Sequence, residues 1–174
     1  IELSGYPELC KVMTPTYIDD IYHASILHDI GKVALPEDNE QNGPLTEDEL
    51  REIDRLHTIA GGDVIREMQQ ESQNSSFLEM AKHIAYFHHE RWDGKGVPHG
   101  LMKREIPLAA RIMAVADIYE DIVSGSLPPQ EREITHRQAE QSIASYSGSR
   151  YDPLVVGAFL TRGEEFKSVS ARFP

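Results

Sequence analysis

The sequence predicts an all-α fold, a bundle of helices, on two observations. Apolar residues recur at the three- and four-residue spacing of amphipathic helices, while the alternating pattern of half-buried strands is poorly represented. Residues that begin or end helices, such as Thr14-Pro15 and Gly31, flank these apolar segments. With 174 residues, 40% of them apolar, the chain is long enough to enclose a full hydrophobic core. We therefore expect one helical domain over residues 1–174, with about the last ten residues as a tail.

The first expected helix begins at Thr14 and ends at Gly31, where a glycine is a natural stop. Ile21 and His28 fall on one face of this helix at helical spacing. Because that face is apolar, His28 should point toward the core. A polar connector over residues 36–44 follows.

Two further helices are expected from their capping boxes. Thr46 and Glu49 open a helix that passes His57 and continues toward residue 68 after an interruption at Gly61-Gly62. After a polar loop over residues 69–75, a second box opens a helix that ends at the next pair of histidines. The residues of that box and pair are Ser76, Glu79, His88 and His89.

Pro107 opens a helix that is apolar on nearly all sides, which is typical of the central helix of a bundle. Asp117 lies on its face of small residues, beside Ala110 and Ala114. The loop before this helix, over residues 90–100, contains three glycines and a proline.

The remaining chain is expected to hold two shorter helices. An irregular stretch over residues 124–133 precedes a capping box at Thr135 and Gln138. Asp152-Pro153 caps a short helix that ends near Gly163.

The formal net charge of −12 argues against binding to a nucleic-acid polymer or an anionic membrane, since both need basic patches. No apolar run is long enough to span a bilayer. The single cysteine, Cys10, excludes an internal disulfide and suits a reducing cytosol, so we expect a cytoplasmic location. Bound cations can still make a phosphate substrate acceptable to an acidic protein.

Six histidine and aspartate side chains stand where helices should bring them to one core. They are His28, Asp29, His57, His88, His89 and Asp117. Buried charged groups are costly unless they are paired or bind a metal, and imidazoles with carboxylates suit iron, manganese, zinc or nickel. Each residue also has an ordinary explanation: a core histidine with a hydrogen bond, a solvated helix end, or Asp117 buried against Arg111. Their convergence by chance is less probable than a metal centre.

Adjacent residues point about 100° apart on a helix, so His28 and Asp29 would serve two ions with a bridging carboxylate. Two ions clamp a phosphate and activate a bridging hydroxide. Lys32, one turn after His28, would hold a phosphate oxygen or protonate the leaving oxygen. The alternative for Lys32 is a simple cation near a helix C-terminus.

Five segments resemble, in order and spacing, the HD-GYP family of bacterial phosphodiesterases that hydrolyse cyclic di-GMP. They are LHDIGKVALP at 27–36, LTEDELREIDRLHTIAGG at 45–62, HHERWDGKGVPHGL at 88–101, IPLAARIMAVADIY at 106–119 and YDPLVVGAF at 151–159. The resemblance implies an HD-superfamily helical bundle with two or three divalent ions, iron or alternatively manganese. By position, the family's ligands fall on the six residues above and its lysine falls on Lys32. The resemblance also implies a cyclic dinucleotide substrate, a receiver or sensor domain upstream, and a further helix of the domain before Ile1.

The chain departs from the family at positions that contact substrate. Val97 replaces the tyrosine of the Gly-Tyr-Pro triplet, and Glu120 stands where the family has a second aspartate. The basic pair that follows has no clear equivalent, although Arg132 and Arg137 lie nearby. We therefore take Lys32, Val97, Glu120 and Arg132 as the candidate substrate residues.

Three hypotheses follow for the function. The first is an active phosphodiesterase, in which Asp29 and Lys32 are the catalytic residues. The second is a metal-loaded but weakly active or inactive module that binds a nucleotide or a signalling protein, through the loop at residues 94–98 beside Trp92. The third, a purely structural helical domain, predicts no stoichiometric metal and is ranked last.

Overall fold

All regular structure in the described part of the chain is helical, which confirms the all-α class. The computed structural model describes residues 11–35, 45–71, 75–124 and 132–170. Within these ranges, two isolated bridges, Asp93–Met102 and Ser147–Tyr151, are the only β pairings. The expected connector at residues 36–44 and most of the stretch at 124–133 lie outside the described residues. None of the helices in these four ranges has the length and apolar character that crossing a membrane requires.

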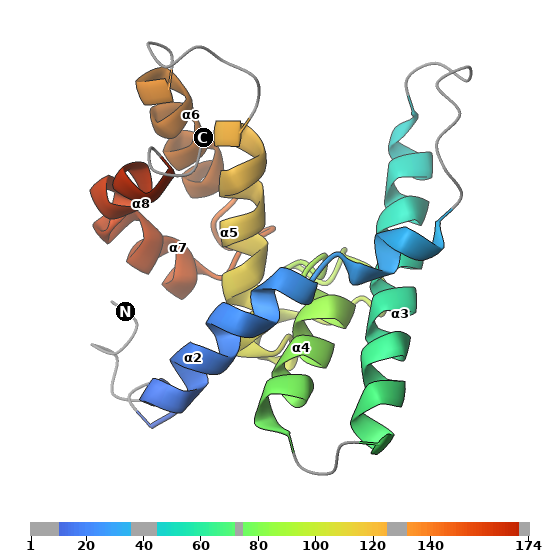
Figure 1. The fold of residues 1–174 in the computed structure, drawn as a ribbon. Helices are drawn as coiled ribbons and strands as arrows, with labels where there is room; N and C mark the ends of the chain where they lie inside the picture. The colour runs from blue at the N-terminus through green and yellow to red at the C-terminus, as the bar shows by residue number, and fades with distance from the viewer. Residues whose placement is uncertain (1–10, 36–44, 72–74, 125–131, 171–174) are drawn as a thin grey trace.

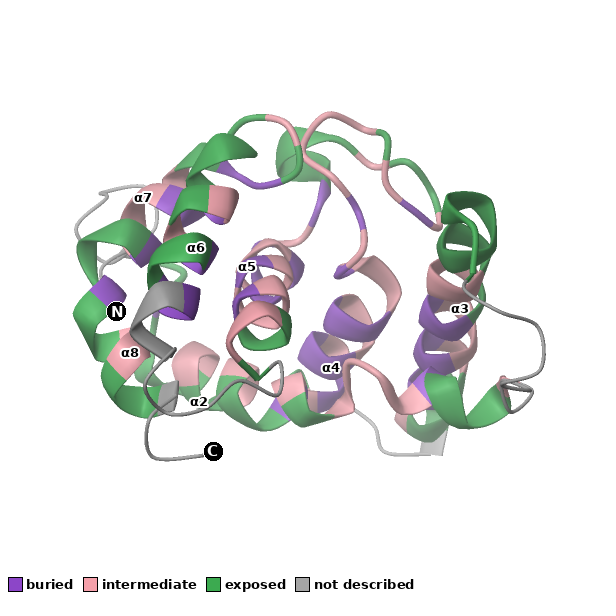
Figure 2. Ribbon diagram, turned by 90° about the horizontal axis from the view of Figure 1, so that it is seen from above, coloured by how far each residue is buried: buried purple, intermediate pink, exposed green. Residues whose placement is uncertain are grey.

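Helix α5 (Leu108–Ser124) stands at the centre of the bundle, as its apolar surface predicts. In Figure 1 it separates α3 (Glu47–Glu71) and α4 (Ser76–Phe87) from a second group of helices, α6 to α8. Two hydrophobic clusters share this helix: Ala109 and Met113 pack toward α4, whereas Val115 and Tyr119 pack toward α6 to α8. Helix α5 therefore has buried residues on two sides, and Figure 2 shows the buried stretches of this helix in purple.

Helix α2 (Pro15–Ala24) is shorter than the sequence predicts. Thr14 caps it, as expected, by accepting a hydrogen bond from Tyr17 N at 3.1 Å. Beyond Ala24 the chain continues as two 3₁₀ turns, Ser25–Leu27 and Ile30–Ala34, so the expected helix to Gly31 was wrong in its last two turns. The carbonyl of Ser25 accepts from both the backbone N and the ring Nδ1 of His28, which tightens the chain at this point.

The capping box that opens α3 is confirmed. Thr46 N donates to Glu49 Oε2 at 2.8 Å, and Glu49 N donates to Thr46 Oγ1 at 3.3 Å. The expected interruption at Gly61-Gly62 was wrong, because α3 runs through both glycines unbroken. For α4 the cap is Ser75 rather than Ser76, and Glu79 bonds Lys82 instead of completing a box.

The second group comprises α6 (Arg132–Ser145), α7 (Pro153–Thr161) and α8 (Gly163–Ser170). The box expected at Thr135 was wrong, because α6 already begins at Arg132. Asp152 caps α7 as predicted, accepting from Leu154 N at 2.9 Å. Residues 163–170 form a helix where a tail was expected, and Phe166 anchors it against the ring of Phe159, 4.9 Å away between centroids.

Candidate metal centre

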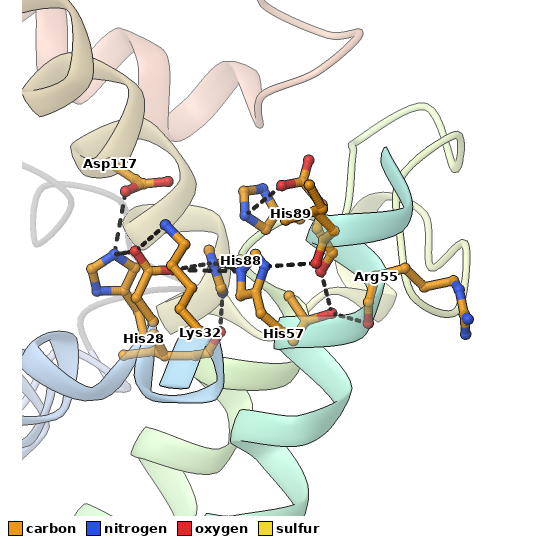
Figure 3. Close-up of polar contacts among 12 residues, drawn as sticks. His28, Lys32, Arg55, His57, His88, His89 and Asp117 are labelled. Atoms are coloured by element: carbon orange, nitrogen blue, oxygen red, sulfur yellow. Dashed lines mark hydrogen bonds and ion pairs between the residues drawn. The ribbon is translucent and has the colours of Figure 1, made fainter. Parts of the chain in front are cut away.

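His28 and Asp29 lie in the turn between the two 3₁₀ segments and point to the same place rather than to two. His28 Nε2 is 3.2 Å from Asp29 Oδ2 and 3.3 Å from Oδ1 of Asp117, which comes from α5 (Figure 3). Asp29 has non-helical backbone angles, so the helical angle of 100° does not apply to this pair. Its carboxylate still has one oxygen beside His28 and the other beside His57 and His88. The turn therefore delivers an imidazole and a carboxylate side by side.

His57 on α3 and His88 at the end of α4 meet at their Nε2 atoms, 3.4 Å apart. Each ring places Nδ1 3.0 Å from the carbonyl oxygen four residues earlier, that of Ile53 or Ile84. Because a carbonyl oxygen only accepts, Nδ1 carries the hydrogen and Nε2 presents a lone pair. Both side chains are fully buried, so the two lone pairs face one another inside the protein.

Asp29 Oδ1 reaches the same point and has no hydrogen-bond partner among the described residues, although it is buried. It lies 3.4 Å from His57 Nε2 and 3.8 Å from His88 Nε2. A buried carboxylate oxygen without a partner is costly, and two imidazole lone pairs beside it add to that cost. A divalent cation between these three atoms would satisfy all of them, so the residues fit the metal that the sequence predicts.

His89 completes a group of three imidazoles. Ligand atoms of His57, His88 and His89 all lie within 4.8 Å of one another. On its other side, His89 Nε2 is 3.6 Å from Oδ1 of Asp54. Asp54 was not among the residues predicted from the sequence. Its spacing from His57 could have indicated it, because residues three apart share one face of a helix.

Burial sets the protonation of the imidazoles. It lowers the pKa of His57, lowers that of His88 to about 4 and lowers that of His89 to about 3. At neutral pH these three rings are uncharged, which is the form that binds a metal.

His28 behaves in the opposite way. Burial acts to lower its pKa, but hydrogen bonds to Asp117 and Asp29 outweigh burial and raise the pKa to about 10. The same contacts, against the effect of burial, hold the pKa of Asp29 and of Asp117 below the usual range. In the metal-free protein His28 is therefore charged, and a metal must displace its Nε2 proton to bind there.

We expect the metal-free protein to lose stability as the pH falls from about 6.5 to about 4. His88 is neutral in the folded protein in this range, whereas the unfolded chain is protonated below its ordinary pKa of 6.5. The unfolded state therefore binds more protons, and the shift of His88 alone corresponds to roughly 3 kcal/mol. The raised pKa of His28 affects stability in a different pH range. Its contribution to the free energy of unfolding is complete below pH 6.5 and disappears as the pH rises toward about 10.

Urea unfolding of chelator-treated protein at a series of pH values measures how the free energy of unfolding changes with pH. A His88→Gln variant should lose a part of this pH dependence, with His57 and His89 supplying the rest, whereas His23→Gln, which changes an exposed histidine near Asp19, should keep all of it. A free energy of unfolding that stays flat across this range would contradict the prediction.

Lys32 sits at the edge of the centre with its Nζ 2.6 Å from Asp29 Oδ2. Its side chain is about half exposed, so the ammonium reaches both the carboxylate and solvent. Burial acts to lower the pKa of Lys32, but Asp29 outweighs it and raises the pKa, which keeps this group a proton donor.

The candidate substrate residues Val97, Glu120 and Arg132 differ in their position relative to the cavity at this centre. A cavity of about 510 Å³ opens over His88, His89 and Asp117, and the buried side chain of Val97 forms part of its wall. Glu120 does not line it: the residue is exposed, and Asp121 takes the place expected for it, because four residues from Asp117 return to the same helix face. Arg132 begins α6, but its side chain lies outside the described residues.

Glu90 is a second residue that the sequence analysis missed. It is buried, and its Oε1 accepts a hydrogen bond from His99 N at 2.7 Å, which ties the loop of residues 94–98 to the end of α4. Gly96 packs directly on this residue, since a Cβ there would stand 2.5 Å from Glu90 Cα. Glu90 thereby fixes the position of Val97 in the cavity wall.

The other histidines and the arginine on α5 have ordinary partners. His83 contacts Glu79 at 3.1 Å, and His136 shares a hydrogen bond with the hydroxyl of Tyr119 at 3.1 Å. Arg111 pairs with Asp152, so the alternative that buried Asp117 against Arg111 was wrong.

Comparisons with known proteins agree with this geometry. The family model described as HD domain matches residues 8–155. A cyclic di-GMP phosphodiesterase of Vibrio cholerae is 37% identical over 172 residues, which are 98% of this chain and 34% of that protein. A cyclic di-GMP phosphodiesterase of Thermotoga maritima is 38% identical over 161 residues, covering 92% of this chain and 42% of its own length.

A crystal structure of a cyclic GMP-AMP-specific phosphodiesterase from V. cholerae has the same fold. The TM-score is 0.65 at 18% identity, over 98% of this chain and 46% of that one. The chain thus spans between about a third and a half of the length of each of these three proteins.

Proposed function

The chain belongs to the HD domain family, in its HD-GYP branch, and from this membership we propose that it hydrolyses a phosphodiester bond of a cyclic dinucleotide of the cyclic di-GMP type. One observation carries the proposal: Asp29 Oδ1 is buried without a hydrogen-bond partner, beside the lone pairs of His57 and His88. Two relatives with 37% and 38% identity carry the name of this activity.

The metal would be iron, or alternatively manganese, as two or three divalent ions. The residues that would hold it are His28, Asp29, His57, His88, His89 and Asp117. When bound, such ions polarise a phosphoryl group and supply a nucleophile from water at neutral pH. The neutral imidazoles and the carboxylates of this chain are the ligand types that iron and manganese accept.

Lys32 and Asp29 act on the substrate side of this centre. The Lys32 ammonium, held by Asp29 at 2.6 Å, would donate a hydrogen bond to a phosphate oxygen or a proton to the leaving oxygen. Burial of His57 and His88 excludes water from one side of the centre, which strengthens the interaction of these charges with a phosphate.

The alternative is a metal-loaded module that binds a nucleotide or a signalling protein with little or no turnover. Val97 favours this alternative, because it offers neither the hydroxyl nor the aromatic ring of the family tyrosine. Lys95, Gly96 and Val97 line the cavity, so the loop of residues 94–98 would touch the same ligand in either case. We further propose that a receiver or sensor domain precedes this part of the full-length protein.

The deciding experiment measures metal and turnover on the same sample. We expect protein prepared anaerobically with ferrous iron to hydrolyse cyclic di-GMP, and a chelator to lower the rate by at least roughly a hundredfold. Cyclic GMP-AMP and bis(4-nitrophenyl) phosphate serve as comparison substrates. Full metal occupancy with ligand binding but no turnover would favour the alternative, and absence of stoichiometric metal would contradict both.

A further inference from the structure

The cavity over the metal centre has an acidic floor, and arginines enter its lining on two sides. The floor carries Asp54 and Asp117 beside the histidines, whereas Arg51 and Arg150 enter the lining from separate elements. Arg51 comes from the second turn of α3, and Arg150 from the connector between α6 and α7. In a chain with a net charge of −12, cations that gather at one cavity need a physical reason.

Arg51 is exposed, and its guanidinium forms one described hydrogen bond. Its Nη2 donates to the backbone carbonyl of Lys95 at 3.2 Å, across the cavity mouth. Glu47 and Asp48 also line the cavity one turn earlier, yet among the described contacts neither forms an ion pair with Arg51. The charge of this arginine is therefore available to a ligand.

Arg150 lies on the other wall and is surrounded by aromatic groups. Its guanidinium stands 4.9 Å from the centre of the Tyr146 ring and lowers the pKa of Tyr151, against the larger effect of burial. The backbone carbonyl of Arg150 accepts from Trp92 N at 2.9 Å, which fixes the residue against the loop at residues 90–96. The described contacts of Arg150 include no carboxylate.

Two other cations of this region are already neutralised, whereas Lys95 also lines the cavity without a described ion pair. Arg91 binds Asp93 through two hydrogen bonds of 3.1 and 2.7 Å, and Lys32 is held by Asp29. Arg51 and Arg150 differ from them in having no ion pair among the described residues.

We propose that Arg51 and Arg150 bind the phosphate of the substrate that is not being cleaved. This inference rests on the proposed function, because a cyclic dinucleotide carries two phosphodiesters in one ring. When one phosphate lies at the metal centre, the other must occupy the same cavity at a distance, where the floor offers it carboxylates and neutral imidazoles but no positive charge. Guanidinium groups bind phosphate oxygens through paired hydrogen bonds, and both arginines can turn toward the cavity.

The assignment answers a question raised by the sequence. The family's basic pair is expected soon after the last metal aspartate, and this chain has no clear equivalent there. Arg51 and Arg150 come from two other segments, so the positive charge is supplied from a different part of the fold.

The test compares a substrate with two phosphates and a substrate with one. We expect Arg51→Ala and Arg150→Ala each to raise the KM for cyclic di-GMP at least about tenfold, the effect of losing one charge-assisted contact. The loss of kcat/KM should be at least about tenfold smaller for bis(4-nitrophenyl) phosphate, which has no second phosphate. Arg66→Ala, which removes the same charge from an exposed position paired with Asp63, is the control and should leave the ratio of the two kcat/KM values unchanged.

The outcomes separate this inference from the proposed function. Equal losses on both substrates, or an unchanged KM for cyclic di-GMP in a variant that combines Arg51→Ala with Arg150→Ala, would overturn it. If the metal-loaded wild type turns over neither substrate, the proposed function fails, and equilibrium binding of cyclic di-GMP to the same variants takes the place of KM. Weaker binding in both arginine variants would then support the inference, and binding equal to wild type would overturn it.

Discussion

Replacing Asp29 with asparagine is expected to remove the metal and to lower hydrolysis of a cyclic dinucleotide by roughly a thousandfold or more. The substitution keeps the shape of the side chain but replaces the carboxylate that contacts His28, His57 and His88. Those contacts measure 3.2, 3.4 and 3.8 Å. No other described carboxylate lies that close to His57 and His88, so no neighbour can take its place.

The measurement is metal per chain together with turnover, on protein whose helical content is verified by circular dichroism. Asp19→Asn is the matched control, because Asp19 also lies near a histidine, His23, at 3.6 Å but is largely exposed on α2. It should retain metal and activity. An Asp29→Asn protein with wild-type metal content and activity within about tenfold would show that this carboxylate is not a ligand.

The general fold was predictable because its signals are local. The apolar surface of α5 predicts a central helix, and Thr14, Thr46 and Asp152 cap helices as their positions predict. The predicted helix boundaries are wrong where tertiary contacts determine the end or the presence of a helix. After the early end of α2, the segment Ile30–Ala34 packs closely on α3, with Gly31 against His57 and Gly61. Helix α8 is a largely polar segment whose Phe166 packs on the core.

The site was predictable to the extent that its residues form recognisable pairs. His28-Asp29 and His88-His89 are conspicuous in the sequence, and the structure brings both pairs together with His57 and Asp117. Other residues were missed because a charged residue on an amphipathic helix is normally solvent-exposed. Asp54 and Asp121 acquire their significance only from the cavity that they line.

Substituting Gly31 with alanine is expected to destabilise the protein by about 3 kcal/mol or more and to lower its metal content. A Cβ at Gly31 would stand 2.0 Å from the carbonyl oxygen of His57 and 2.5 Å from Gly61 N. Both are backbone atoms of α3, so the clash cannot be relieved by a rotating side chain. The 3₁₀ segment Ile30–Ala34 must then move away from α3.

This movement would reach the metal centre directly. Gly31 follows His28 by three residues and Asp29 by two, and the backbone that it presses against is that of His57. The distance of 3.4 Å between Asp29 Oδ1 and His57 Nε2 depends on the same contact. A loss of packing between α3 and this turn therefore separates two groups of ligands, and stability and metal content should fall together.

Gly157→Ala is the matched control for this prediction. Gly157 lies inside α7, and a Cβ there meets nothing within 4 Å. Alanine should stabilise the helix by about 0.5–1 kcal/mol, with no change in metal content. Urea unfolding and metal analysis of the two variants check both expectations. If Gly31→Ala unfolds within about 1 kcal/mol of the wild type and keeps its metal, the contact of this turn with α3 does not hold the centre together.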